Sequence, residues 1–103
     1  MAYTRLNPAS AEATITHGSA IKYGRVVTVN VNVSANDTTT TGYMSLGFLP
    51  QSMWPPMDSY AATARGDGSG STGILNVKAS NGEVRAYVPV AYKQYVGTVS
   101  YIV

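Results

Sequence analysis

The groups in this chain that could do acid–base chemistry are few and scattered along the sequence. The five carboxylates lie far apart, at Glu12, Asp37, Asp58, Asp67 and Glu83. Glycosidic cleavage needs two opposed carboxylates at a set separation, and no pair here has a spacing that one strand or helix would bring together. No nucleophile-elbow motif surrounds any serine, and a lone histidine such as His17 is usually structural or solvated. The pattern therefore predicts a protein that is not an enzyme.

The segment that begins at Asp67 has the start, but not the end, of a calcium-binding loop. Asp67-Gly68-Ser69-Gly70-Ser71 has a suitable opening, but Lys78 stands where the twelfth, acidic ligand is needed. The glycines lack the lysine and following helix of a phosphate-binding loop, and the chain has no cysteine. Integrins read the tripeptide Arg65-Gly66-Asp67, which also occurs often by chance. We expect no metal and no cofactor, and a flexible surface loop over residues 65–73.

The best candidates for binding a ligand are aromatic side chains in the expected loops. Tyr and Trp combine an apolar face with a polar tip, which suits stacking on sugar rings and also suits subunit interfaces. Trp54, Tyr92 and Tyr95 are therefore the candidates to stack on a saccharide, with packing or subunit contact as the alternative for Trp54. Three polar side chains are the candidates to hydrogen-bond such a ligand: His17, Asp58 and Arg65.

Length and composition favour one all-β domain. The 103 residues carry a net charge of +2 and include 12 Val, 11 Thr and 8 Tyr, and β-branched and aromatic residues favour strands. Seven dispersed cations argue against nucleic acid as a partner, and no apolar run is long enough for membrane insertion. We expect a single domain over residues 1–103, with residues 1–13 as an N-terminal linker or short segment. The only helix-like stretch, residues 9–13, is too short to be stable alone.

Alternation of apolar and polar residues predicts the strands. The clearest runs from about residue 20 to 33, where Val27, Val29, Val31 and Val33 share one face and Gly24 is a candidate bend. Further strands are expected at residues 43–49, 60–64 and 98–103. A polar loop follows at 34–42, and three prolines force residues 50–56 to cross an end of the fold. Such short, evenly spaced strands predict an antiparallel β-sandwich or small, jelly-roll-like β-barrel.

Asn81-Gly82 between two alternating runs predicts a β-hairpin. This dipeptide favours a two-residue type I′ turn, which would pair Val77 with Ala86 and Leu75 with Val88. The apolar members of both strands would then lie on one face. Lys78 would lie opposite Arg85 on the other face, which we expect to be wet because two cations repel each other.

The order of features in the chain resembles a family of phage proteins. Those features are, in order, Tyr23-Gly24-Arg25-Val26-Val27-Thr28-Val29, Leu49-Pro50, Trp54-Pro55-Pro56, Ile74-Leu75-Asn76-Val77, Asn81-Gly82-Glu83-Val84-Arg85-Ala86-Tyr87 and Gly97-Thr98-Val99-Ser100-Tyr101-Ile102. Over most of residues 14–103 this order is similar to the C-terminal head domain of tail-fibre and baseplate receptor-binding proteins of phages and prophages of Gram-positive bacteria.

The resemblance implies a homotrimeric β-sandwich head on the virion, at the tail tip or baseplate. Such a head binds saccharides of the host cell wall or surface and assembles with other tail or baseplate proteins. No sugar-contact motif of the family matches this chain position by position, so the candidate residues rest on side-chain chemistry. Two alternatives remain open: a structural trimerisation or baseplate-assembly domain, and the trimerising end of a polysaccharide depolymerase.

Overall fold

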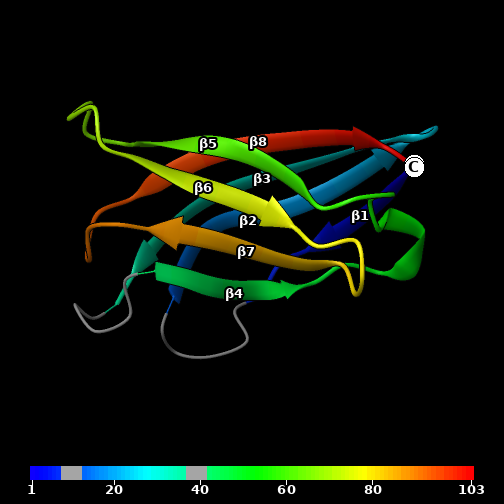
Figure 1. The fold of residues 1–103 in the computed structure, drawn as a ribbon, viewed down its shortest axis with the longest axis horizontal. Coiled ribbons are helices and arrows are strands. Elements are labelled where there is room, and N and C mark those ends of the chain that lie inside the picture. The colour runs from blue at the N-terminus through cyan, green and yellow to red at the C-terminus, as the bar shows by residue number, and fades with distance from the viewer. Residues whose placement is uncertain (8–12, 37–41) are drawn as a thin grey trace.

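The computed structural model describes residues 1–7, 13–36 and 42–103 and has an all-β, antiparallel fold (Figure 1). Residues 9–12 of the helix-like stretch, and most of the polar loop at 34–42, lie outside this range. The eight strands are β1 (Ala2–Arg5), β2 (Ala13–Tyr23), β3 (Val26–Ala35), β4 (Gly42–Phe48), β5 (Ser59–Arg65), β6 (Thr72–Val77), β7 (Glu83–Val88) and β8 (Tyr95–Ile102). The short 3-10 helix η2 (Gln51–Met53) lies between β4 and β5.

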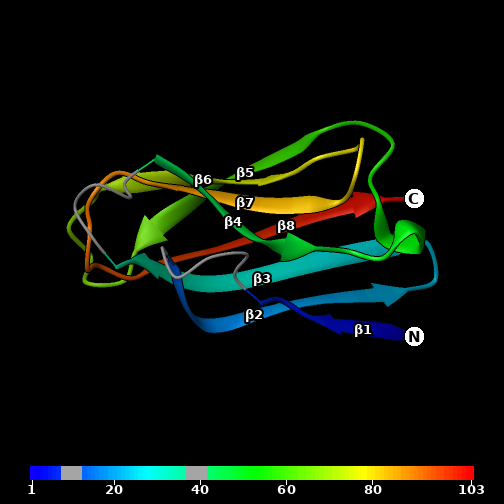
Figure 2. The same ribbon diagram turned by 90° about the horizontal axis from the view of Figure 1, so that it is seen from below.

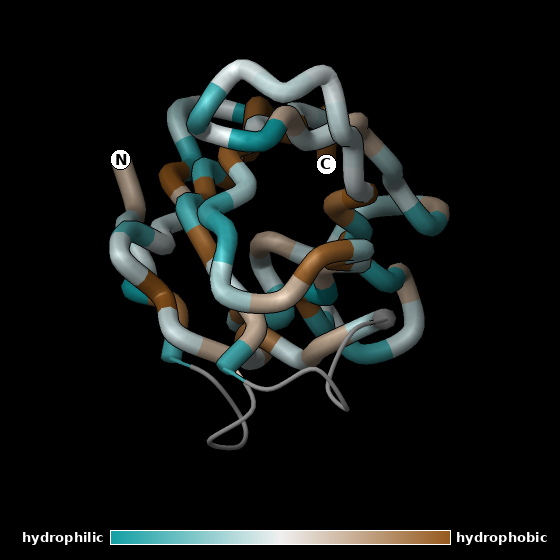
Figure 3. The backbone as a smooth tube through the Cα atoms, turned by 90° about the vertical axis from the view of Figure 1, so that its left-hand side faces the viewer, coloured by the Kyte–Doolittle hydropathy of each residue, from teal (hydrophilic) through white to brown (hydrophobic). Residues whose placement is uncertain are grey.

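All eight strands form one sheet that curls into a half-barrel, in the order β1-β2-β3-β8-β5-β6-β7-β4. The halves β1-β2-β3-β8 and β5-β6-β7-β4 face each other as two layers (Figure 2). Seen along its long axis, the backbone winds round a single interior (Figure 3). The two halves are joined in the sheet by only two residue pairs between β5 and β8, Ala64 with Val96 and Arg65 with Tyr95. The expected all-β, sandwich-like fold is confirmed.

The core lies between these two layers and comes from the predicted apolar faces. Val27, Val29, Val31 and Val33 of β3 are all buried, which confirms the alternation in the sequence. The opposite half supplies buried apolar residues from β4, β6 and β7: Met44, Leu46, Leu75, Val77, Val84, Ala86 and Val88. Burial of both stripes in one cluster is the main stabilisation of a sheet of this size.

The predicted single strand over residues 20–33 is wrong, because Gly24 ends one strand and starts a hairpin. β2 and β3 pair from Tyr23 and Val26 onward, so Gly24 and Arg25 form a two-residue turn. Gly24 has a φ of +62°, and a positive φ at the first central residue is the pattern of a type II′ hairpin turn. The N-terminal segment also gains structure, since residues 2–5 form β1 on the edge of β2.

The hairpin between β6 and β7 is present, but its predicted register is wrong by two residues. Val77 pairs with Val84 and Leu75 with Ala86, so the connection is longer than two residues. A slip of two keeps every side chain on its expected face, and the apolar set stays buried. The slip also removes the predicted contact of two cations, because Arg85 now lies opposite Asn76.

Candidate functional site

The loop after β5 and the loop before β8 meet at one end of the molecule and form a pocket there. This end lies at the left of Figure 1. The pocket encloses about 390 Å³ and is lined by Arg65, Gly66, Asp67, Tyr92, Lys93 and Gln94. We call it the end pocket. A backbone hydrogen bond from Gly66 N to Gln94 O, 2.8 Å long, ties the two loops together. Two of the six predicted binding residues, Arg65 and Tyr92, therefore lie together.

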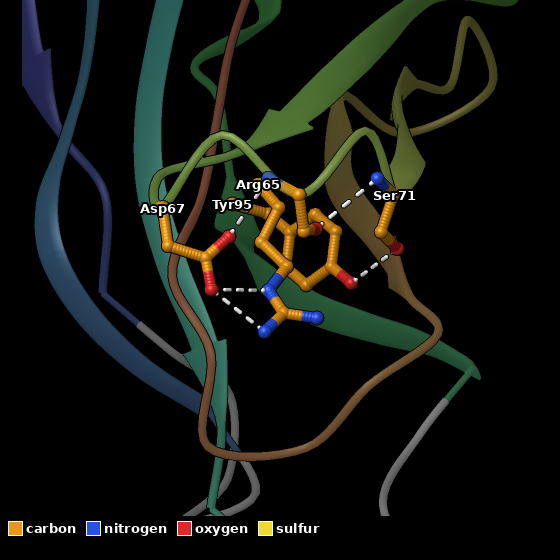
Figure 4. Close-up of polar contacts among 5 residues, drawn as sticks. Arg65, Asp67, Ser71 and Tyr95 are labelled. Carbon is orange, nitrogen blue, oxygen red and sulfur yellow. Dashed lines mark hydrogen bonds and ion pairs between the residues drawn. The ribbon is translucent and has the colours of Figure 1, made fainter.

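Arg65 and Asp67 form an ion pair in the wall of the end pocket (Figure 4). Asp67 Oδ2 lies 2.6 Å from Arg65 Nη2 and accepts a 2.9 Å hydrogen bond from Nε. Asp67 Oδ1 accepts from the backbone N–H of Ser69 at 3.1 Å. The hydrogen bond from Arg65 lowers the pKa of the Asp67 carboxyl below its ordinary value of 3.8. The Asp67 carboxylate is therefore ionised at neutral pH, and the ion pair orients the two side chains toward each other.

Tyr95 supports the end pocket from below and does not line it. It was expected in a loop, but it lies at the start of β8 and is fully buried. Its hydroxyl shares a 2.8 Å hydrogen bond with Ser71 Oγ (Figure 4), while Arg65 N donates to Ser71 O. A buried ring cannot stack on a ligand, so the prediction for Tyr95 is corrected. Its burial and its hydroxyl instead hold the loop of residues 66–71 against the strands.

Tyr92 is the aromatic side chain that the end pocket presents to solvent. It is 66% exposed, and its φ of +64° places it in the left-handed region. Such a φ is unusual for a bulky residue and occurs where the surrounding structure imposes it. A 2.9 Å hydrogen bond from Tyr92 N to Ala35 O, at the end of β3, fixes the backbone there. The ring is thus held outward at the mouth of the pocket.

Trp54 and Asp58 lie at the opposite end of the molecule and are structural. The indole Nε1 of Trp54 donates a 2.8 Å hydrogen bond to Leu49 O, and the half-buried ring packs on the core. Asp58 Oδ1 accepts a 2.8 Å hydrogen bond from Ala79 N in the β6–β7 connection. Both residues stabilise this end of the molecule. For Trp54 the contacts therefore support packing, which was the alternative to stacking on a saccharide.

His17 lies on the outer side of β2, apart from both ends. It is exposed, and its Nε2 lies 3.3 Å from Ser19 Oγ. The register of β2 against β3 shifts beside it, between Ile15 and His17. His17 contributes to a separate depression of about 420 Å³ with Tyr3 and Arg5. It therefore shares no site with Arg65 and Tyr92.

Sequence reasoning missed four residues that line the end pocket: Gly66, Asp67, Lys93 and Gln94. Lys93 and Gln94 directly follow Tyr92, so proximity to a candidate aromatic residue was the available signal. In the sequence alone, Asp67 is part of the tripeptide Arg65-Gly66-Asp67, which often occurs by chance. The structure shows the Asp67 carboxylate paired with Arg65.

The end pocket combines an exposed aromatic ring, a fixed guanidinium–carboxylate pair and exposed polar side chains. Stacking and charge-assisted hydrogen bonds are what this set can supply. In the part of the chain described, no three His, Asp or Glu residues lie close enough to hold a metal ion. Of the carboxylates, Glu12 and Asp37 fall outside that part.

Comparisons with known proteins leave the chain unassigned: no family model matches it, and no curated protein matches it. No helix over residues 1–7, 13–36 and 42–103 is long and apolar enough to cross a membrane.

Proposed function

We propose that this protein is a non-catalytic receptor-binding head of a phage tail fibre or baseplate, which binds a host-surface saccharide in the end pocket. The observation that carries the proposal is the exposed ring of Tyr92 beside the fixed Arg65–Asp67 pair. An aromatic face next to oriented hydrogen-bonding groups is the pairing that a sugar ring needs, because one face of the sugar is apolar and its hydroxyls are polar.

The position of the end pocket also supports the proposal. The N- and C-termini both lie at the other end of the molecule, on the right in Figure 2. A head attached through either terminus would present the end pocket outward, toward a host surface. The resemblance implies a homotrimer, and three copies of a shallow pocket would convert weak single contacts into useful avidity.

A glycan array probed with the protein displayed at high valency tests the proposal. We expect binding to a host cell-wall or surface saccharide, with loss of at least ten-fold in apparent affinity for Tyr92→Asn. Asn removes the ring and tolerates the positive φ at this position. Tyr92→Phe keeps the stacking face, so most of the binding should remain. Arg65→Gln should also weaken binding, because it removes the charge-assisted hydrogen bonds.

Tyr23→Asn is the matched control. Tyr23 is 75% exposed and lies at the β2–β3 turn, so its loss should leave saccharide binding unchanged. Absence of binding at high valency, or equal loss for the Tyr23 and Tyr92 variants, would overturn the proposal. Binding to phage tail proteins alone would favour the assembly alternative, and turnover of host polysaccharide would favour a depolymerase.

A further inference from the structure

Asn81-Gly82 is the dipeptide in this chain at which an asparagine can most readily lose ammonia without an enzyme. The backbone nitrogen of the residue after an asparagine can attack the side-chain amide carbon, Cγ, and close a five-membered succinimide ring. The amide leaves as ammonia, which takes up the proton of the attacking nitrogen, and water then opens the ring to aspartate or isoaspartate. Glycine permits the closest approach because it has no Cβ. Of the asparagines in the chain, only Asn81 precedes a glycine.

The folded connection between β6 and β7 engages both reacting groups in hydrogen bonds. The attacking atom, Gly82 N, donates a 3.0 Å hydrogen bond to Lys78 O. The side-chain Oδ1 of Asn81 accepts a 3.0 Å hydrogen bond from Glu83 N. For the ring to close, Gly82 N must give up its proton to a base and move onto Asn81 Cγ. Both hydrogen bonds oppose these changes.

Gly82 is also packed too tightly to move toward the Asn81 side chain. It is buried, and an added Cβ would lie 2.2 Å from Trp54 Nε1. Gly82 O accepts a 2.9 Å hydrogen bond from Leu49 N, and Trp54 Nε1 in turn donates to Leu49 O. The connection and the segment around η2 lie together at the right of Figure 1. We call the contacts of Gly82 with Trp54, Leu49 and Lys78 the Gly82 contacts.

The isoaspartate product does not fit the closed connection. In isoaspartate the backbone runs through the former side chain, which lengthens the main chain by one carbon atom next to Gly82. The Gly82 contacts leave no room for an added carbon. A connection that has reacted in this way therefore stays open, and each reaction also replaces a neutral amide by a carboxylate two residues from Glu83.

We propose that Asn81 is a site of spontaneous deamidation and that opening of the Gly82 contacts sets its rate. While the contacts are closed the asparagine is protected, and while they are open it reacts as in the unfolded chain. The rate then equals the rate in the unfolded chain multiplied by the fraction of molecules in which the contacts are open. The inference does not depend on saccharide binding, because the β6–β7 connection and the end pocket lie at opposite ends of the molecule (Figure 1).

Peptide mapping by mass spectrometry after incubation at pH 8.5 tests the inference. Deamidation adds a single dalton to the peptide that contains Asn81, and chromatography separates its aspartate and isoaspartate forms. In concentrated urea we expect Asn81 to react before every other asparagine. In buffer without urea the reaction should be at least ten-fold slower. At intermediate urea concentrations the rate should rise in proportion to the unfolded fraction, which far-UV circular dichroism measures.

Trp54→Phe removes the indole donor and should accelerate the deamidation of the folded protein. The expected increase is about five- to thirty-fold, which is the increase in the open population that the loss of such a hydrogen bond produces. Tyr23→Phe is the matched control. It also deletes one polar group from an aromatic side chain, but Tyr23 is 75% exposed, so the rate should be unchanged. Asn81→Gln should show no reaction at residue 81, because the longer side chain cannot close the five-membered ring.

Equal rates of deamidation with and without concentrated urea would overturn the inference, since the Gly82 contacts would then give no protection. Another asparagine reacting first in urea would also overturn it. So would a rate that does not follow the unfolded fraction at intermediate urea concentrations, or a destabilised Trp54→Phe protein that keeps the rate of the unmodified protein.

Discussion

At the scale of single residues, two aromatic side chains hold the end of the molecule opposite the end pocket. Trp54 donates from its indole to Leu49 O, and its ring lies against Gly82. Tyr101 of β8 donates its hydroxyl to Met53 O at 2.6 Å, which links the two layers. The residue types suggested sugar stacking for Trp54. The role of Trp54 is decided by its position between the proline-rich segment 50–56 and the β6–β7 hairpin. That position depends on tertiary contacts, which no local sequence pattern shows.

Trp54→Phe is expected to weaken the fold without affecting the end pocket. Phe keeps much of the packing area but cannot donate to Leu49 O, and leaving that carbonyl without its donor costs about 1–2 kcal/mol. The free energy of unfolding, measured by urea titration with far-UV circular dichroism, should fall by that amount. Saccharide binding should be unchanged; a loss of binding in a fully folded variant would return Trp54 to the list of ligand contacts.

The stability of the protein is expected to fall between about pH 10 and pH 12 because of Tyr101. Burial raises the pKa of its hydroxyl from 10.0 to about 12. In the unfolded chain the phenol ionises above pH 10, while the folded state keeps it protonated. The contribution of the Tyr101 hydroxyl to the free energy of unfolding is therefore fully present below pH 10, and it is lost as the pH rises toward 12.

Tyr101→Phe should flatten this part of the pH dependence, which urea titrations at pH 9 and pH 11.5 would measure. Tyr23→Phe, at a 75% exposed tyrosine, is the control and should retain the slope of the unmodified protein. Equal slopes for the Tyr101 variant and the unmodified protein would show that other groups cause the alkaline loss.

At the scale of elements, the β6–β7 hairpin shows what periodicity can and cannot determine. Alternation alone assigns side chains to faces, and it predicted the buried apolar side chains of both strands. It did not predict the burial of Asn76, which lies on the face expected to be wet. Register depends on the turn, and here the connection is tied down from outside: Leu49 N donates to Gly82 O, and Asp58 accepts from Ala79 N. These partners come from the crossing of residues 49–58, so the Asn-Gly signal was outweighed by contacts distant in sequence. Gly24 was misassigned for a simpler reason, since one glycine can bend a strand or end it.

Gly82→Ala is expected to destabilise the hairpin strongly. The φ of Gly82 is +72°, and an added Cβ would lie 2.2 Å from Trp54 Nε1 and 3.0 Å from Leu49 O. Backbone strain and overpacking together should lower the free energy of unfolding by about 2–4 kcal/mol. Gly24→Ala is a matched control: its φ is +62° and nothing lies within 4 Å of the added Cβ. Strain alone should then cost about 1 kcal/mol. Equal losses in urea titrations would mean that the contact with Trp54 relaxes freely.

At the scale of the whole molecule, the shared core joins the two layers more strongly than the sheet does. Only two residue pairs connect β5 to β8, whereas the valines of β3 and the apolar residues of β6 and β7 form one cluster. Composition was sufficient to predict an all-β fold with such a core. Composition cannot show which loops meet at which end, because that follows from the order of strands in the closed fold.

The two layers are therefore expected to unfold together. Amide hydrogen exchange of Val29 in β3 and Ala86 in β7, both buried and in central strands, should give the same free energy of opening. That value should equal the global free energy from urea titration. Amides of the edge strand β1 should exchange faster. A lower free energy for one layer would show that the layers open as separate units.

The end pocket has one further consequence, which concerns how new specificities arise. Its two loops are held to the strands by the hydroxyl pair of Ser71 and Tyr95, to each other by the bond from Gly66 to Gln94, and to the end of β3 by the bond from Tyr92 to Ala35. The last two bonds use only backbone atoms. The frame that positions the loops is thus largely separate from the side chains that face a ligand. A library randomised at Asp67, Ser69, Lys93 and Gln94 would vary recognition. The scaffold should stay the same if Ser71, Tyr95 and the three positive-φ residues Gly68, Gly70 and Tyr92 are retained.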